Sequence, residues 1–351
     1  MSTPSIPSQY THITLAERPT GDITSSTFKV EQAPTQTLLP RKSGEVLVRV
    51  DYVSIDPAMR IWVTLESYMK VIPIGDTMRA NGTGTVVAVH KSDESNGKVK
   101  VGDIVNWYSG WSEYQLADVE DLLVVSGPDS TAEDYLDAMA NMVSRTAYFG
   151  MLNVGQVKAG ETVVVSGAAG AVGNIAIQIA KLKGSKVIGI AGGEDKCRWV
   201  ESLGANKCLD YKSKTFAEDF DKEVGKLDVY FDNVGGETLD LVLTHLNPLA
   251  RIVICGSIGN YNGGGKPPSI NYLPLLFANA KMEGFVVTRF ADSYPQANKD
   301  IKQWKKEGKL KIPFHVEEGL ESCPKYLQDI FKGTNKGKMI VKISSKEPGS
   351  L

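Results

Sequence analysis

Three glycines, Gly167, Gly170 and Gly173, directly follow a short apolar segment, Thr162–Ser166, that is rich in β-branched residues. Such a segment is typical of a strand buried on both faces of a parallel sheet. Residues 171–183 then place apolar side chains on one helical stripe, and the first amides of this helix, at Ala171 and Val172, have no partner within it. The glycines supply a tight turn, a close approach of backbone to a pyrophosphate, and close packing of helix on strand. The pattern predicts a dinucleotide phosphate site.

The residues after the next strand indicate which dinucleotide is favoured. Enzymes that use NAD place an Asp or Glu there, roughly 20 residues beyond the glycines, to hold the ribose 2′-hydroxyl. This chain has Ala191–Gly193 instead, and Lys196 follows shortly after Gly192. The ammonium group of Lys196 can neutralise a 2′-phosphate, although Glu194 and Asp195 bring negative charge nearby. The alternative is a solvated surface lysine. We predict NADP(H) as the cofactor.

Metal ligands are scarce in the chain. It has four cysteines, of which Cys197 is the first, and four scattered histidines. Neither residue type shows the spacing of a zinc site. The cysteines lie far apart in sequence, which favours reduced and mostly buried thiols. We therefore predict no bound metal, and without a Lewis acid the oxidation of a simple alcohol is difficult.

Strands and short helices alternate through the middle of the chain. The expected strands are 162–166, 186–190, 207–209, 227–231, 250–255 and 282–287, and the expected helices are 171–183, 195–203, 216–224, one ending near residue 245, and 294–307. This order predicts an α/β fold with a doubly wound parallel sheet and right-handed crossovers. Because ligands bind beyond the carboxyl ends of such strands, residues 167–173, 191–193, 232–236 and 256–261 are expected to ring one crevice.

The first third of the chain has a different pattern. Residues 45–54, 84–90 and 102–107 alternate apolar and polar side chains between Gly and Asp turns, which predicts a β-rich domain, most simply a small barrel. Near the end, a short helix at 323–331 precedes a strand at 337–343. We expect this strand to return to the first domain, which makes that domain discontinuous.

Length and composition set the broad class. A chain of 351 residues is expected to form two domains, because a single hydrophobic core of that size would be unusually large. A net charge of −2 gives no electrostatic case for nucleic acid as a partner. No apolar run reaches the roughly 20 residues needed to cross a bilayer, and the polar start is unlike a signal peptide. We expect a cytoplasmic protein without membrane partners.

These motifs together resemble a known family. The chain is similar to the zinc-independent medium-chain dehydrogenase/reductase superfamily, and within it to the leukotriene B4 dehydrogenase, prostaglandin reductase and alkenal double-bond reductase family. The resemblance runs from about Lys42 to Ile343 through the segments 54–60, 146–150, 166–173, 191–196, 210–212, 230–236, 254–258 with Tyr261, 282–287 and 337–338. It implies a Rossmann domain over 139–308, and a GroES-like β-barrel catalytic domain over 1–138 and 309–351.

The resemblance also implies roles for individual residues. Lys196 and Tyr211 would hold the 2′-phosphate, and Tyr261 would lie by the nicotinamide ribose as the hydrogen-bond donor to an enolate oxygen. A turn tyrosine is the alternative for Tyr261. The remaining implied cofactor contacts are Gly167, Gly170, Ala171, Val172, Gly173, Gly192, Asn233, Cys255, Gly256, Ser257, Ile258, Phe285, Val286, Val287 and Asn335.

The substrate side departs from the family pattern. Ala58 stands where plant and mammalian members carry a tyrosine that touches substrate, so a hydrogen bond is lost and space is gained. Residues 143–145 replace the usual Gly-Leu-Thr, and Arg145 is expected either to bind an anionic substrate group or to make a surface or salt-bridged contact. Tyr68 is expected either to line the pocket or to be an exposed loop aromatic.

Three functions agree with these features. The leading hypothesis is an NADPH-dependent reductase that transfers hydride to the β-carbon of α,β-unsaturated aldehydes and ketones, the enals and enones. The second is an NADP-dependent dehydrogenase of allylic or 12-hydroxy-type alcohols, which the family resemblance also allows. The third is a non-catalytic NADPH-binding protein. Similarity suggests a homodimer joined by the edge strand 282–287.

Overall fold

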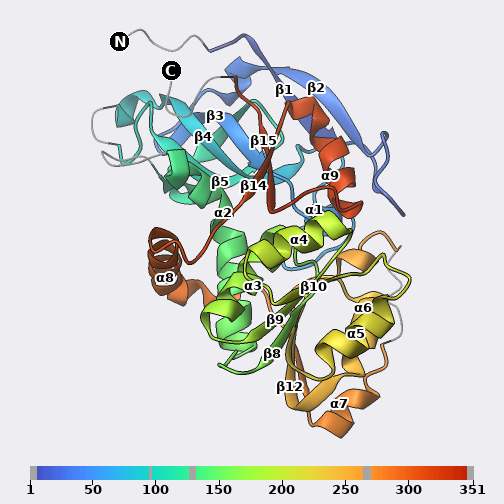
Figure 1. The fold of residues 1–351 in the computed structure, drawn as a ribbon. Helices are drawn as coiled ribbons and strands as arrows, with labels where there is room; N and C mark the ends of the chain where they lie inside the picture. The colour runs from blue at the N-terminus through green and yellow to red at the C-terminus, as the bar shows by residue number, and fades with distance from the viewer. Residues whose placement is uncertain (1–5, 95–96, 126–131, 264–269, 346–351) are drawn as a thin grey trace. The chain divides into compact units, whose positions relative to one another are not determined.

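A six-stranded parallel sheet lies at the centre of the second of two units into which the chain divides (Figure 1). The computed structural model describes residues 6–94, 97–125, 132–263 and 270–345. The first unit runs to Ala140 and also contains His315–Lys332 and the residues from Met339 onward, and the second contains Asn141–Phe314 and Gly333–Lys338. Residues 309–314 and 333–338, expected in the first domain, thus group with the second unit.

The parallel sheet follows the order β10-β9-β8-β11-β12-β13, in which every adjacent pair is parallel. Its strands are β8 (Thr162–Val165), β9 (Lys186–Ala191), β10 (Lys207–Asp210), β11 (Leu227–Asp232), β12 (Leu246–Ile254) and β13 (Lys281–Gly284). Val163, Val164 and Val165 in β8 are completely buried, as expected of a strand covered on both faces. The strand order reverses between β8 and β11, and this reversal marks the place where ligands bind to doubly wound sheets.

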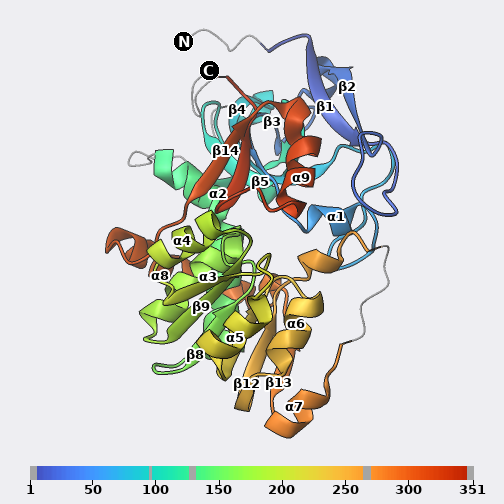
Figure 2. The same cartoon turned by 45° about the vertical axis from the view of Figure 1, so that its right-hand side comes forward.

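Helices cover this sheet on both faces (Figures 1 and 2). They are α3 (Ala171–Leu182), α4 (Glu194–Ser202), α5 (Phe216–Val224), α6 (Gly236–Leu243), α7 (Leu273–Ala278) and α8 (Tyr294–Lys306). One apolar cluster buries Phe220 of α5 and Leu239 of α6 against Ile188 and Tyr230 of the sheet. The expected boundaries agree closely with the observed ones for most elements, because apolar periodicity and glycine stops coincide there.

The prediction of local structure was incomplete in several places, among them α7, which was not predicted, and β12, which begins at Leu246 instead of residue 250. The last strand of the sheet ends at Gly284 instead of Val287, because the chain turns into a short 3-10 segment, Val287–Ser293. The helix α2 (Ala132–Phe149), which continues into the π-helical turn Gly150–Val154, was not predicted. Gly150 is required there, because a Cβ at this position would lie 2.5 Å from the ring of Phe231.

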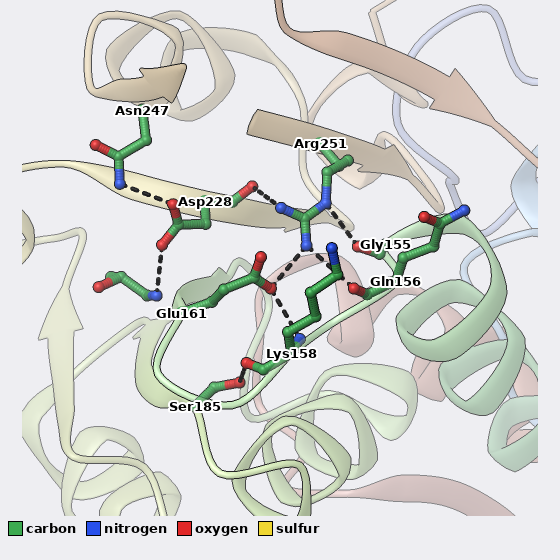
Figure 3. Close-up of polar contacts among 9 residues, drawn as sticks. Gly155, Gln156, Lys158, Glu161, Ser185, Asp228, Asn247 and Arg251 are labelled. Atoms are coloured by element: carbon green, nitrogen blue, oxygen red, sulfur yellow. Dashed lines mark hydrogen bonds and ion pairs between the residues drawn. The ribbon is translucent and has the colours of Figure 1, made fainter. Parts of the chain in front are cut away.

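A polar cluster fixes the opposite, amino-terminal side of the sheet (Figure 3). Arg251 of β12 forms an ion pair with Glu161, just before β8, at 2.7 Å, and donates to the carbonyl oxygens of Gly155 and Gln156 at 2.9 and 3.1 Å. The Asp228 carboxylate in β11 accepts the Thr162 amide at 2.8 Å. This cluster ties the loop that follows the π-helical turn to three strands.

The first unit is built around antiparallel strands. They are β1 (Gln9–Leu15), β2 (Phe28–Pro34), β3 (Glu45–Ser54), β4 (Arg79–Val89), β5 (Ile104–Gly110), β6 (Tyr114–Asp118), β7 (Leu123–Val124), β14 (Phe314–Glu318) and β15 (Lys338–Lys342), together with the helices α1 (Met59–Trp62) and α9 (Cys323–Phe331). β1 pairs with β2, and the others form a seven-stranded sheet. As predicted, the C-terminal strand β15 returns to this unit and pairs with β3, its red ribbon beside a blue one in Figure 1.

Among the described residues, no helix is both long enough and apolar enough to span a bilayer.

Candidate cofactor-binding site

The glycine-rich turn joins β8 to α3. Gly167 has a φ of +57°, a conformation that favours glycine. A Cβ on Gly173 would lie 2.2 Å from the carbonyl oxygen of Gly167, so only glycine lets the helix approach the turn this closely. Gly170 is the N-cap of α3, and no side chain caps the helix. The first amides of α3, including those of Ala171 and Val172, are thus directed to the crevice end of the sheet, as a phosphate site requires.

Asp232, at the end of β11, organises the loops around this turn; it lies in the segment 232–236 that was expected to ring the crevice, but no individual role was predicted for it. Its side chain is 1% exposed, and its Oδ1 accepts hydrogen bonds from Ser166 Oγ, Tyr230 Oη and the amides of Val234 and Gly235 at 2.9–3.0 Å. Its backbone oxygen accepts the amides of Cys255 and Gly256. Burial raises the pKa of this carboxyl, and no described residue donates to Oδ2. A polar residue ending an apolar strand at the sheet reversal is the signal that could have identified it.

The predicted contacts after β11 and β12 meet in this region. The Asn233 side chain donates to the carbonyl oxygen of Ser166 at 2.7 Å, and the Asn233 carbonyl accepts the Ile258 amide at 3.1 Å. The Tyr261 hydroxyl accepts the Ser257 amide at 3.0 Å. A Cβ on Gly256 would lie 3.1 Å from the same hydroxyl. The loop from Cys255 to Tyr261 is therefore folded back on itself, with the phenol of Tyr261 beside the backbone of Gly256.

Basic side chains gather after β9 and β10. The Lys196 ammonium donates to the Gly333 carbonyl at 2.7 Å. Burial, together with the positive charges of Lys212 and Lys336, lowers the pKa of Lys196 to about 8. A Cβ on Gly192 would lie 2.8 Å from the Tyr211 ring, which is 49% exposed. The absence of a side chain at Gly192 lets this ring lie over the loop.

The acidic residues near this basic cluster are already engaged. The Asp210 carboxylate accepts the amides of Gly193 and Lys212 at 2.8 and 2.9 Å. Glu194 and Asp195 both form ion pairs with Arg198. Repulsion between these carboxylates and a bound phosphate is therefore reduced, and the ammonium group of Lys196 is left to attract an anion.

A C-terminal segment joins the glycine-rich turn. The Gly337 amide donates to the Ala169 carbonyl at 2.9 Å, and Gly337 forms a parallel bridge with Gly170. The side chain of Asn335 donates to the Gly337 carbonyl at 2.9 Å. This packing places residues 333–338 in the second unit and brings Asn335 to the phosphate turn from far along the chain.

Other predicted site residues have varied surroundings. Phe285 lies against the π-helical turn, because a Cβ on Gly150 would be 2.8 Å from its ring, and Val286 and Val287 follow it beyond β13. Arg145 donates to Asn298 Oδ1 at 2.8 Å and its guanidinium lies 4.3 Å from the ring centre of Tyr294. Burial lowers the pKa of Arg145. The described side chains that hold it are thus polar and aromatic, not acidic.

Ala58 and Tyr68 lie in the first unit. Ala58 is half-buried and is the N-cap residue of α1, packed against the apolar core of that unit. Tyr68 is 54% exposed.

A dinucleotide-binding sheet and a β-rich unit in one chain define a two-domain oxidoreductase of the medium-chain dehydrogenase/reductase class. Two family matches agree with this class, the "N-terminal domain of oxidoreductase" over residues 11–125 and the "zinc-binding dehydrogenase" over residues 171–303. Although the second description mentions zinc, no three His, Cys, Asp or Glu side chains gather into a possible metal site in the described part of the chain.

Similarity to individual proteins identifies the family within this class. The chain is 36% identical to the NADPH-dependent curcumin reductase of Escherichia coli, over 95% of this chain and 96% of the relative. It is 38% identical to prostaglandin reductase 1 of Bos taurus, over 94% and 98%. The crystal structure of CurA from Vibrio vulnificus in complex with NADPH matches with a TM-score of 0.87 and 35% identity, over 96% of this chain and 100% of that one.

The chain belongs to the zinc-independent medium-chain dehydrogenase/reductase family that includes prostaglandin reductase 1 and curcumin reductase. The predicted family, the two-domain α/β fold class, the enzyme class and NADP(H) as cofactor are thereby confirmed. The roles of individual residues stay predictions.

Proposed function

We propose that the protein is an NADPH-dependent reductase of carbon–carbon double bonds conjugated to an aldehyde or ketone. The observation that carries this proposal is the similarity, along nearly the whole chain, to an NADPH-dependent curcumin reductase and to prostaglandin reductase 1. The crevice at the reversal of the sheet supports it, because its glycine-rich turn and basic cluster suit a dinucleotide with a third phosphate.

Different residues of the crevice would contact different parts of the cofactor. The amides of Ala171 and Val172 at the start of α3 would hold the pyrophosphate, where the helix dipole favours negative charge, while the Gly170 amide donates to the Gly167 carbonyl and holds the turn. Lys196, assisted by Tyr211 and Lys212, would hold the 2′-phosphate, because a partly buried ammonium group forms a stronger ion pair than an exposed one. Asn233, Asn335 and the loops 255–258 and 285–287 would contact the remainder.

Tyr261 is proposed as the catalytic hydrogen-bond donor. The bound nicotinamide supplies a hydride for the β-carbon of the substrate. The negative charge that results develops on the carbonyl oxygen, where a hydroxyl donor stabilises it. Because the Tyr261 oxygen accepts the Ser257 amide at 3.0 Å, its own O–H is more polarised and is a better donor. The same hydrogen bond fixes the position of the phenol.

The alternatives are dehydrogenation of an allylic alcohol and NADPH binding without turnover. A panel of enals and enones with NADPH deuterated at the transferred position separates them. We expect consumption of NADPH and deuterium on the β-carbon of the saturated product. Deuterium on the carbonyl carbon would instead show reduction of the carbonyl group. Oxidation of allylic alcohols with no enone reduction would favour the dehydrogenase, and no turnover with any substrate would favour the binding protein.

We also propose a homodimer. Helix α7 lies beside β12, next to the edge strand β13 (Figure 2), and large apolar side chains at and around α7 are exposed. Tyr272, Leu276 and Phe277 are 73%, 68% and 77% exposed, and Leu249 in β12 is 69% exposed. Among the described strands β13 pairs only with β12, so its other edge can pair with the same strand of a second copy about a two-fold axis. Such an interface would cover the exposed side chains.

The finer assignments on the substrate side stay proposals. We propose that the small Ala58 admits a bulkier substrate than a tyrosine would, and that Tyr68 lines the same pocket. For Arg145, the contacts to Asn298 and Tyr294 support a role in holding α8 more directly than a role in binding substrate. A cytoplasmic location also stays a prediction.

A further inference from the structure

Two cysteines that are separate in sequence meet beneath the basic cluster. The amide of Cys208 in β10 donates to Glu201 Oε1 of α4 at 3.0 Å. A Cβ on Gly189 would lie 3.4 Å from Cys208 Sγ and 2.8 Å from Val200 of α4, so the Cys208 thiol faces this helix. Cys197 is one turn before Val200 and therefore on the same helix face. Both thiols therefore face the space between α4 and β10, and the interaction with the Cys208 thiol lowers the pKa of Cys197.

The position of this pair connects it to cofactor binding. Cys197 directly follows Lys196 in the first turn of α4, and Cys208 is close in β10 to Asp210. Asp210 in turn holds the amides of Gly193 and Lys212. A covalent S–S bond is about 2.05 Å long, much shorter than a hydrogen bond between thiols. Forming it would draw the start of α4 toward β10 and displace Lys196 and the loop at Gly193.

We propose that Cys197 and Cys208 form a reversible disulfide when the protein is exposed to a peroxide, and that this bond weakens the binding of NADPH through its 2′-phosphate. The effect on the phosphate rests on the proposed role of Lys196. The pair would thus be an oxidation site that controls how much NADPH the enzyme holds.

The two sulfurs have complementary chemical roles. The neighbouring Cys208 thiol lowers the pKa of Cys197, against the opposing effects of burial and of the Asp210 and Glu201 carboxylates, and so favours the Cys197 thiolate, the reactive form. The Cys197 sulfur attacks one oxygen of hydrogen peroxide, the O–O bond breaks, and a sulfenic acid forms. The Cys208 sulfur then attacks the sulfenic sulfur, the S–O bond breaks, and water leaves with the Cys208 proton. Two thiols are oxidised and one peroxide is reduced to two waters.

The other two cysteines, Cys255 and Cys323, are expected to be less reactive toward peroxide than the pair. Burial raises the pKa of Cys255 to about 12, and it also raises the pKa of Cys323, which is completely buried in the core of the first unit. Cys197 and Cys208 are 7% and 5% exposed and Cys255 is more exposed than either, so the contrast with Cys255 lies in its raised pKa and not in its accessibility. Neither Cys255 nor Cys323 has a thiol partner in the described part of the chain. We therefore expect oxidation to select the pair.

The test is made on the full chain without added cofactor. The protein is treated with a small excess of hydrogen peroxide, free thiols are alkylated, and peptides are mapped by mass spectrometry without reduction. NADPH and NADH are then titrated by fluorescence before and after oxidation. We expect a bond between Cys197 and Cys208, a Kd for NADPH that rises roughly 10- to 100-fold, and a change for NADH of less than about threefold. Dithiothreitol should restore the original Kd.

Cysteine variants test whether the effect of peroxide on NADPH binding depends on Cys197 and Cys208. In Cys197→Ser and Cys208→Ser the Kd for NADPH should not respond to peroxide, whereas Cys323→Ala should respond like the parent protein. Absence of the bond from the wild-type peptide map, which depends on no variant, would overturn the proposal. So would a bond that leaves the Kd for NADPH unchanged, or one that weakens NADPH and NADH equally. Failure of the Lys196 assignment shows separately, as an unchanged NADPH affinity of reduced Lys196→Ala.

Discussion

Lys196 is partly buried and surrounded by like charges, so its protonation is sensitive to pH close to neutrality. Its ammonium group is paired with a carbonyl oxygen, and the carboxylates nearby are engaged elsewhere. Such a lysine gains a strong partner when an anion binds. The Tyr261 phenol is positioned differently, by accepting a backbone amide. These two residues give separate predictions for binding and for turnover.

The affinity for NADPH should depend on pH through Lys196. The protonated form binds a phosphate, and the pKa of this lysine in the free protein is about 8, so the affinity should fall as pH rises above that value. Between pH 7 and 9 we expect a loss of roughly 10-fold for NADPH and little change for NADH. Lys196→Ala should cost about 1.5–3 kcal/mol of NADPH binding free energy and should flatten the pH profile. Fluorescence titration measures both, and equal losses for the two cofactors would refute the assignment.

Turnover should depend on the hydroxyl of Tyr261. Tyr261→Phe keeps the ring but removes a donor whose interaction strengthens as the enolate charge develops. We expect kcat on an enone to fall about 10- to 1,000-fold while the Kd for NADPH stays nearly unchanged. The unpartnered Ser257 amide should also lower stability by about 1 kcal/mol, which a thermal melt of the free protein separates from catalysis. A variant with full kcat would remove Tyr261 from the mechanism.

At the scale of elements, the two ends of the parallel sheet have different tasks. The carboxyl ends of the strands carry the loops of the cofactor crevice, which Asp232 links together. The amino-terminal side is fixed by Arg251, whose guanidinium joins β12 to Glu161 and to the loop at Gly155 and Gln156 (Figure 3). Gln156 has a positive φ of 48°, so these hydrogen bonds also hold an unfavourable backbone conformation. Stability and cofactor binding should therefore be separable.

Removal of the Arg251 side chain should reduce stability and leave cofactor affinity intact. The side chains of Arg251 and Glu161 are 19% and 17% exposed, so loss of one partner leaves a mostly buried charge. We expect Arg251→Ala to lower the free energy of unfolding by about 2–4 kcal/mol in urea titrations. Arg251→Lys, which keeps the charge but not the planar fork, should lose less. A Kd for NADPH that is more than about twofold higher in the folded Arg251→Ala variant would show that the amino-terminal and carboxyl ends of the sheet are energetically coupled, contrary to this prediction.

At the scale of the whole molecule, the exposed apolar side chains of α7 and the open edge of β13 are the features that a second copy would cover. We predict a dimer in light-scattering measurements coupled to gel filtration. The double substitution Leu276→Glu and Phe277→Glu should shift the protein toward the monomer, because the dimer interface would bury two charges without partners. Val30→Glu, at a 44% exposed apolar position of β2, is the matched control and should remain dimeric. A wild-type monomer, or a dimer that tolerates the α7 charges, would contradict this interface.

The sequence by itself determined the parts that depend on local pattern. The β-branched run before Gly167, the spacing of the three glycines and the absence of an acid at Ala191–Gly193 predicted the phosphate turn and the cofactor, because each reflects the stereochemistry or charge of neighbouring residues. The boundaries of α5 and α9 were predicted correctly for the same reason. The sequence did not predict the long helix α2, the end of β13 at Gly284 or the grouping of residues 333–338 with the second unit.

Only the tertiary structure decided what depends on residues distant in the chain. It joined Gly337, and with it the neighbouring Asn335, to the glycine-rich turn through a hydrogen bond to Ala169, and it placed Cys197 and Cys208 on facing sides of α4 and β10. It gave Asp232 its central position, by bringing the Ser166 hydroxyl from the end of β8 to the carboxyl oxygen that also accepts donors within three residues of Asp232. Such contacts leave no local periodicity, since each needs only one suitable side chain at a position that folding brings near. The pKa of Lys196 is likewise a property of the fold, because burial and the charges of Lys212 and Lys336 act through space.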